Sequence, residues 1–176
     1  MPIRSFDDLI ESARTMGPKR VALVAADQME ALQAASRAYA EGLAQFVLIG
    51  DAERIESLLA EEKLDLGSPE IIREDSVRRA SQRGVDLARV GAVDLLMNGR
   101  AQPMHLIQIA VDPFSGLRTT QIMTDVAVFE IPGVDRLILV ADVLVVPYPQ
   151  LDEKMGIVQN AIDVAMALGV QTPPGA

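Results

Sequence analysis

The sequence predicts an α/β fold: a three-layer domain with a parallel sheet, then an antiparallel strand pair and a long helix toward the C-terminus. Residues 21–25 and 46–49 are unbroken apolar runs, which are typical of strands buried on both faces. These runs alternate with segments of helical periodicity, and such alternation indicates parallel strands with helices on both faces of the sheet. The alternation stops after Gly116, where two apolar runs follow each other directly.

Capping residues and glycines divide the first half of the chain into elements. Ser5 with Asp8, and Asp27 with Glu30, have the spacing of a helix N-cap and its partner three residues later. We expect, in chain order, a helix over 6–15, a strand over 21–25, a helix from Asp27 to near Gly42, a strand over 46–49, a helix capped by Asp51, a short strand over 70–72, a helix from 75 or 76 to 90 and a strand over 95–97.

The sequence of the second half of the chain predicts a β-hairpin followed by one long helix. The apolar runs 126–131 and 137–146 are joined by a segment that begins Pro132-Gly133, which favours a type II turn and therefore an antiparallel pair. Apolar residues then recur at helical spacing from Leu151 to Met166, and Gly169 is the expected stop. We expect two domains, an α/β domain over residues 1–124 and a partial second domain over 125–176.

Composition excludes several kinds of function. The chain has 176 residues and a formal net charge of -9, which argues against nucleic acid as a partner. It has no cysteine and one histidine, so no cysteine or histidine-rich metal site is expected. Neither a signal peptide nor an apolar run of membrane-spanning length is visible in the sequence. We therefore expect a cytoplasmic protein that uses no metal and does not bind membranes.

The stretch around residues 94–100 is the candidate binding site. A short apolar run ends at Asn98-Gly99 and a helical pattern follows, so a strand, a glycine loop and a helix come in succession. Such junctions bind anions, because N–H groups at the helix N-terminus point outward unpaired. Arg100 could add a cation, and Arg118 could hold phosphate with its planar fork. Two plainer interpretations stay open: an ordinary turn at Asn98-Gly99, and an exposed loop charge at Arg118.

Two further groups of charged residues have alternative interpretations. Asp142 stands between predicted strand residues, where an unpaired carboxylate would be costly to bury. It is therefore either functional or bonded to a neighbouring turn. Arg78, Arg79 and Arg83 lie on the outer side of a predicted helix, and a solvated face is the simpler interpretation.

Six segments carry a family resemblance: residues 20–26, 42–51, 94–99, 116–118, 125–133 and 141–154. In this order and spacing they resemble the amino-terminal half of the phosphate acetyl/butyryltransferases. The resemblance implies acyl transfer between coenzyme A and phosphate, with acyl-CoA or acyl phosphate as substrate and no cofactor. It implies a homo-oligomer, at least a dimer, with a fold similar to the isocitrate and isopropylmalate dehydrogenases. The implied phosphate and coenzyme A site comprises Asn98, Gly99, Arg100, Arg118 and Asp142.

Departures from the family pattern define the alternatives. The family commonly has lysine at Asn98 and threonine at Pro103, and its members are about twice as long, as two domains require. The first hypothesis is a truncated family member without autonomous activity, completed by a separately encoded C-terminal half that carries the catalytic residues. The alternative is a non-catalytic ligand-binding or assembly module that dimerises through the strands of residues 126–146. A third possibility is an excised piece of a longer enzyme.

Overall fold

The computed structural model describes residues 3–117, 119 and 121–171, which form two compact units. The first, here called the sheet unit, comprises Met16–Arg118; the second, the hairpin unit, comprises Met1–Thr15 and Thr119–Ala176. The α/β class, the parallel sheet and the antiparallel strand pair are as the sequence predicts. The domain boundary at residue 125 stays a prediction.

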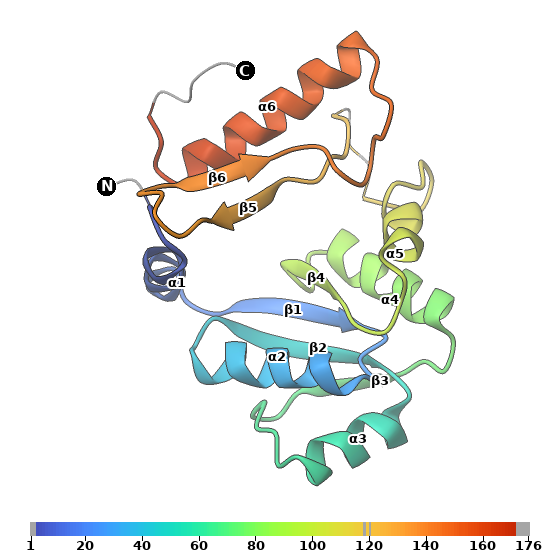
Figure 1. Cartoon of the computed structure of the whole chain (residues 1–176). Helices are drawn as coiled ribbons and strands as arrows, with labels where there is room; N and C mark the ends of the chain where they lie inside the picture. Colours follow the sequence, from blue (N-terminus) through green and yellow to red (C-terminus); the bar gives the residue numbers. More distant parts are fainter. Residues whose placement is uncertain (1–2, 118, 120, 172–176) are drawn as a thin grey trace. The chain divides into compact units, whose positions relative to one another are not determined.

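The sheet unit is built around four parallel strands in the order β3-β2-β1-β4 (Figure 1). Each of the four strands is followed by a helix that starts within 5 positions of the end of the strand, and these helical connections let neighbouring strands run in the same direction. Its elements are β1 (Lys19–Val24), α2 (Met29–Ala40), β2 (Ala44–Gly50), α3 (Ala52–Glu61), β3 (Glu70–Arg73), α4 (Val77–Arg89), β4 (Leu95–Asn98) and α5 (Pro103–Ala110).

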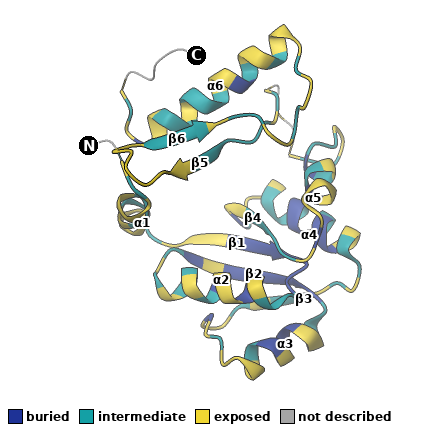
Figure 2. Cartoon of the chain, viewed as in Figure 1, coloured by how far each residue is buried: buried dark blue, intermediate teal, exposed yellow. Residues whose placement is uncertain are grey.

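Two apolar layers cover the two faces of this sheet. Leu23 of β1 and Leu48 of β2 face one layer, which contains the apolar sides of α2 and α3. Val24 and Ile49, one residue further along, face the other layer, formed by α4 and α5. All four side chains are 0% exposed, and Figure 2 shows the second half of β1 and most of β2 as buried. The three-layer arrangement that the unbroken apolar runs predict is therefore confirmed.

The helix caps of the sheet unit agree with the sequence at one junction and differ at another. Asp51 caps α3, since its Oδ1 accepts a hydrogen bond of 3.1 Å from the Arg54 N–H. The prediction that Asp27 caps α2 is wrong: the N-cap is Gln28, which makes no side-chain capping bond. Asp27 instead pairs with an arginine from another loop.

The hairpin unit contains α1 (Phe6–Thr15), β5 (Ala127–Glu130), β6 (Leu137–Val140) and α6 (Leu151–Ala167). The strands are antiparallel, with Val128 opposite Leu139. The turn between them is the predicted one: the Val134 N–H donates to the Ile131 carbonyl at 3.0 Å, and Gly133 has φ +85°. At the start of α6, Glu153 Oε2 accepts the Gln150 N–H at 2.7 Å, as in a capping box.

Helix α1 belongs to the hairpin unit although it comes first in the chain. The Phe6 N–H donates to Glu130 Oε2 at 2.7 Å, and Arg4 forms a 2.9 Å ion pair with Asp135. The Ile3 N–H donates to the Leu168 carbonyl at 2.9 Å, next to the end of α6. These contacts attach the start of the chain to the strand pair and to the last helix.

Within the described residues, none of the helices combines the length and the apolar character that a membrane crossing needs.

The contact between α4 and β1 gives a stability prediction. A Cβ added at Gly84 would lie 2.6 Å from Val24 Cγ2, whose side chain is fully buried and cannot move aside. Alanine gains about 1 kcal/mol of helix propensity over glycine, but overpacking a core costs about 1–3 kcal/mol. We expect Gly84→Ala to lower the free energy of unfolding, measured by urea denaturation.

The matched control is Ser81→Ala, one turn earlier on the same helix. The Ser81 hydroxyl is buried and has no hydrogen-bond partner among the described residues. Removing it should raise the free energy of unfolding by about 0.5–2 kcal/mol. A more stable Gly84→Ala variant would contradict the close packing of α4 on β1.

Candidate functional site

The loops that follow β1 and β4 meet at the carboxyl edge of the sheet. The Gly99 N–H donates to the Val24 carbonyl at 2.8 Å, and the Arg100 N–H donates to the Ala25 carbonyl at 2.9 Å. Strand order reverses at β1, since β2 and β3 lie on one side of it and β4 on the other. Ligands of open α/β sheets bind at such reversal points, outside the carboxyl ends of the strands. This edge is therefore the candidate site.

Backbone crowding explains the glycine at position 99. A Cβ at Gly99 would collide with the Ala25 carbonyl oxygen, so only glycine lets the two loops approach this closely. Ala25 itself has φ +52°, a left-handed conformation that is uncommon for alanine. The plainer interpretation of Gly99, a turn that needs a glycine, therefore accounts for its presence, while the turn still brings the backbone of both loops to the edge.

Asn98 closes the loop after β4 through its side chain. Its Nδ2 donates to the Ala101 carbonyl at 2.6 Å. Its Oδ1 is buried and has no donor among the described residues. A buried acceptor without a donor destabilises the free protein by about 1–3 kcal/mol. Asn98 thus holds the turn with one atom and leaves an unsatisfied acceptor with the other.

An ion pair that sequence reasoning missed crosses this edge. Arg100 Nε lies 2.8 Å from Asp27 Oδ2; the Arg100 side chain is 47% exposed and that of Asp27 is 9% exposed. The other carboxylate oxygen, Oδ1, is buried without a partner among the described residues. The sequence did contain one indication that Asp27 belongs to the site: Asp27 comes soon after the buried strand β1, at the same edge of the sheet as Asn98. Its spacing to Glu30 pointed to a helix cap instead.

Three helices of the sheet unit, α2, α4 and α5, start without side-chain caps, and two of them, α2 and α5, follow the strands at the reversal point, β1 and β4. The N-cap residues of α2 and α5 are Gln28 and Gln102, and the side chain of neither accepts a hydrogen bond from its own helix. Helix α2 therefore leaves its first N–H groups available to an anion, with the helix dipole in their favour. Helix α5 offers fewer donors, because Pro103 has no N–H and the His105 N–H donates to the Gln102 carbonyl at 2.9 Å. Helix α3, capped by Asp51, lacks this capacity. The edge therefore offers backbone donors and one half-exposed guanidinium.

Arg118 of the predicted site lies outside the described residues. The loop before it is well organised: Asp112 Oδ1 accepts the N–H groups of Ser115 and Phe114 at 2.8 and 2.9 Å, and these bonds lower the pKa of Asp112. The Leu117 N–H then donates to the Ala110 carbonyl at 2.7 Å, at the end of α5. The chain therefore returns to α5 immediately before Arg118.

Asp142, the remaining predicted site residue, lies in the hairpin unit and organises a turn. Its Oδ1 accepts the N–H groups of Leu144 and Val145 at 2.9 and 2.8 Å, and its Oδ2 accepts the Asp125 N–H at 3.2 Å. Burial raises the pKa of Asp142, but its interaction with the Asp125 side chain and hydrogen bonds from the N–H groups of Val145, Leu144 and Val146 outweigh burial and lower the pKa. Because the turn takes these N–H groups, β6 ends at Val140 and not at residue 146 as predicted. Any ligand-binding role stays a prediction.

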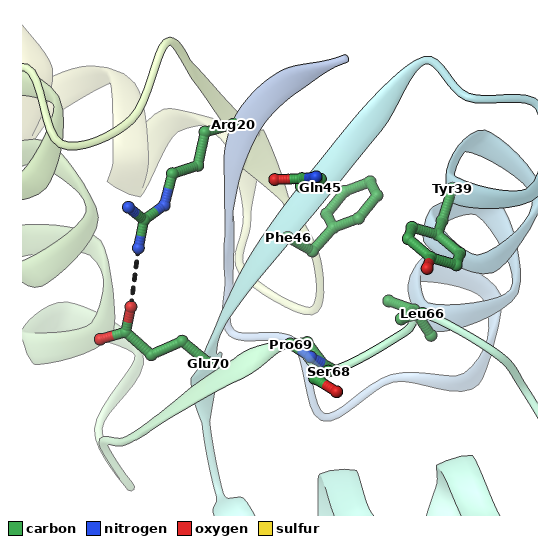
Figure 3. A pocket seen from close by; sticks show the side chains of 8 residues that line it. All are labelled: Arg20, Tyr39, Gln45, Phe46, Leu66, Ser68, Pro69 and Glu70. Carbon is green, nitrogen blue, oxygen red and sulfur yellow. Dashed lines mark hydrogen bonds and ion pairs between the residues drawn. The ribbon is translucent and has the colours of Figure 1, made fainter.

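A pocket at the opposite, amino-terminal edge of the sheet is a weaker candidate. Its volume is about 270 Å³, and its walls include Tyr39, Phe46 and Leu66 (Figure 3). Its one cation, Arg20, already binds Glu70 at 2.8 Å. Ligand pockets usually enclose about 300–1,000 Å³ and occur at the carboxyl edge of such sheets. Among the described residues, no three His, Asp or Glu side chains lie close enough together to hold a metal ion.

The turn held by Asp142 gives a pH prediction. A carboxyl whose pKa is lowered by folding stabilises the protein above its unfolded pKa of about 3.9, and this contribution is lost as the pH falls through the folded pKa. Asp142→Ala leaves several N–H groups unpaired and should lower the free energy of unfolding at pH 7 by about 1–3 kcal/mol. The loss should shrink in denaturation experiments at pH 3.

Asp135→Ala is the control for this comparison. Asp135 pairs with Arg4 at the surface, where its side chain is 87% exposed. Such a pair contributes about 0–1 kcal/mol. An equal loss for both variants, or an Asp142→Ala loss that does not depend on pH, would contradict the role of Asp142 in the turn.

Several curated proteins are similar in sequence to this chain over most of its length. The family described as phosphate acetyl/butaryl transferase matches residues 68–176. A phosphate butyryltransferase from Clostridium acetobutylicum is 34% identical over 171 residues, which cover 97% of this chain and 57% of the relative. A phosphate acetyltransferase from Thermotoga maritima is 31% identical over 168 residues, 96% of this chain and 56% of the relative. The chain thus spans a little over half the length of these curated relatives.

Solved structures show the same fold. A branched-chain phosphotransacylase from Enterococcus faecalis has a TM-score of 0.74 at 24% identity, over 88% of this chain and 54% of that one. A phosphotransacetylase from Staphylococcus aureus has a TM-score of 0.71 at 18% identity, over 93% of this chain and 58% of that one. The family match over residues 68–176 agrees with the resemblance that the sequence motifs indicate. The chain belongs to the phosphate acetyl/butaryl transferase family.

Proposed function

We propose that this chain takes part in acyl transfer between coenzyme A and phosphate. The observation that carries the proposal is the carboxyl edge of the sheet unit, where two uncapped helix N-termini and the half-exposed Arg100 meet at a strand-order reversal. The two curated relatives compared above, a phosphate butyryltransferase and a phosphate acetyltransferase, support this class of reaction. In this proposal Asn98, Gly99 and Arg100 hold the phosphate of acyl phosphate or of coenzyme A, and Arg118 and Asp142 are further candidate ligands from the family resemblance.

The chemistry needs charge stabilisation more than a cofactor. In the forward direction the coenzyme A sulfur attacks the carbonyl carbon of an acyl phosphate, the carbon–oxygen bond to phosphate breaks, and the thiol proton passes to a base. Negative charge grows on the carbonyl oxygen and on the departing phosphate. Fixed N–H donors and a guanidinium stabilise such charge, because they are already oriented when it develops. Coenzyme A is thus a substrate, and its use fits the predicted cytoplasmic location.

In this proposal the anion lies close to the helix N-termini and to Arg100, and it therefore binds although the chain has a net charge of -9. At physiological ionic strength, charges beyond about 8 Å are largely screened. An anion at the edge therefore experiences the nearby donors more strongly than the distant carboxylates. Net charge consequently does not argue against this substrate class.

Activity, in this proposal, also needs residues that the relatives carry beyond the part matched here. The chain covers 57% and 56% of the two curated relatives compared above. We also propose that this chain, together with a C-terminal half, has a fold similar to that of the isocitrate and isopropylmalate dehydrogenases. It follows that the chain alone should bind phosphate or coenzyme A, and that turnover should require a C-terminal half, supplied separately from a relative.

Phosphate-dependent release of thiol from acetyl- and butyryl-coenzyme A tests this proposal. We expect release when the chain is mixed with the C-terminal half of the Clostridium acetobutylicum relative. Arg100→Ala should lower kcat/KM about ten- to a hundredfold, the effect of losing one charged hydrogen bond. Arg79→Ala is the matched control, because Arg79 pairs with Glu74 at 3.0 Å on the solvated face of α4.

Equal activity of the Arg100→Ala and Arg79→Ala proteins would remove the carboxyl edge from the proposed site. Thiol release by the chain alone would show that the additional half is unnecessary. Absence of both coenzyme A binding, by calorimetry, and turnover would contradict the proposed reaction for this chain.

We propose in addition that two copies of the chain associate through the hairpin unit. Phe129 and Val140 point to the same face of the β5–β6 pair and are 48% and 40% exposed. Val128 and Leu139, on the opposite face, are half-buried. Ile131, next to this surface, is 44% exposed. Apolar side chains gathered in this way usually lie against another protein surface, and a second copy of the same strand pair is the simplest partner.

Light scattering at micromolar concentration tests this association. We expect a dimer for the unchanged chain and a monomer for Phe129→Asp, because a buried carboxylate in the interface would be strongly unfavourable. Val90→Asp is the control: Val90 is 72% exposed but lies at the end of α4 in the sheet unit. A monomer for the unchanged chain, or a dimer for Phe129→Asp, would contradict the association surface.

A further inference from the structure

Asp27 occupies a position where helix capping is usual, yet it does not cap. Asp27 follows β1 and Asp51 follows β2, so both stand at junctions from a strand to a helix of the same sheet. Asp51 caps α3 through the Arg54 N–H. Asp27 leaves α2 to start at Gln28 without a side-chain cap, and its carboxylate contacts Arg100 at 2.8 Å. Asp27 therefore binds a partner from a distant part of the sequence in place of its own helix.

The protein holds this carboxylate at a cost in stability. The Asp27 side chain is nine-tenths buried, and Oδ1 has no donor among the described residues. Oδ1 lies so close to Gly50 that a Cβ there would be 2.9 Å from it. Burying a carboxylate with half of its hydrogen-bonding capacity unused is unfavourable. Local arrangements that lower stability in this way are expected mainly where function requires them.

The contact leaves the anion-binding end of Arg100 available. Asp27 engages Nε, and no described residue binds the terminal nitrogens Nη1 and Nη2. These two nitrogens form the fork that binds two oxygens of a phosphate at once. With the side chain 47% exposed, the fork can reach a ligand. An arginine that is already held in one conformation loses less entropy when the ligand binds.

We propose that Asp27 is a positioning residue, which holds Arg100 by Nε so that its terminal nitrogens bind a phosphate oxyanion at the carboxyl edge of the sheet. This inference rests on the proposed function, since it takes Arg100 as a phosphate ligand. It adds a residue outside the predicted site and assigns it a role through another side chain.

The direction in which phosphate affinity changes when the Asp27 carboxylate is removed distinguishes a positioning role from simple charge repulsion. Removing a carboxylate beside an anion site should tighten anion binding if only Coulomb repulsion matters. Removing a positioning group should weaken it. We expect Asp27→Ala to weaken inorganic phosphate binding about tenfold, equal to about 1.4 kcal/mol. Asp27→Asn keeps an oxygen beside Nε but loses the charge of the ion pair, so its phosphate affinity should lie between those of Asp27→Ala and the unchanged chain.

The measurement is an NMR titration of the Gly99 N–H with inorganic phosphate at constant ionic strength, with the melting temperature of each variant recorded. Asp51→Ala is the matched control: it removes the α3 cap and should lower the melting temperature without changing phosphate affinity. Equal or tighter phosphate binding by Asp27→Ala overturns the inference. So does Asp27→Asn binding as weakly as Asp27→Ala, because the retained acceptor would then have no effect.

Arg100→Ala separates this inference from the function on which it rests. If the unchanged chain shows no phosphate binding, or if Arg100→Ala binds equally well, the proposed phosphate site is wrong and the inference falls with it. If Arg100→Ala loses affinity and Asp27→Ala does not, the site stands and only the positioning role is wrong.

Discussion

The burial of β1 on every side is the constraint on which the sheet unit depends. The strand is hydrogen-bonded to β2 on one edge and β4 on the other, and its side chains from Ala22 to Val24 are fully buried. With no polar face to turn toward water, β1 must be the centre of the sheet, between two layers of helices. Strand order therefore reverses at β1, and the loops after β1 and β4 meet.

That meeting concentrates donors in a chain with an excess of acidic residues. The Gly99 and Arg100 N–H groups bind the carbonyls of Val24 and Ala25, and this backbone pairing places Arg100 beside Asp27. Two helices start at the same edge without caps. Unsatisfied acceptors on Asp27 and Asn98 lower stability at the same place. A protein under selection for stability alone would cap these helices and pair these oxygens, so the edge has the features of a functional site.

The hairpin unit follows different physics. Asp125 and Asp142 use their carboxylates as acceptors for backbone N–H groups of residues 143–146, which shapes the turn after β6. These hydrogen bonds stabilise the turn, whether or not Asp142 also contacts the ligand of the proposed function. The strand pair keeps apolar side chains exposed on one face, with Phe129 48% exposed. This exposed apolar surface is the observation on which the proposed association with a second copy rests.

The sequence by itself determined the fold class, nearly every helix and strand, and the family. Unbroken apolar runs, capping pairs and Pro132-Gly133 are local signals, and local signals specify local structure. They could also locate the loop of Asn98 and Gly99, because a strand, a glycine turn and a helix follow one another in the chain. Tertiary structure decided the rest. The Asp27–Arg100 pair joins residues 73 positions apart, and the end of β6 depends on contacts between Asp125 and Asp142. Such pairs arise from strand order and loop packing, which are properties of the folded chain and leave no periodic pattern in the sequence.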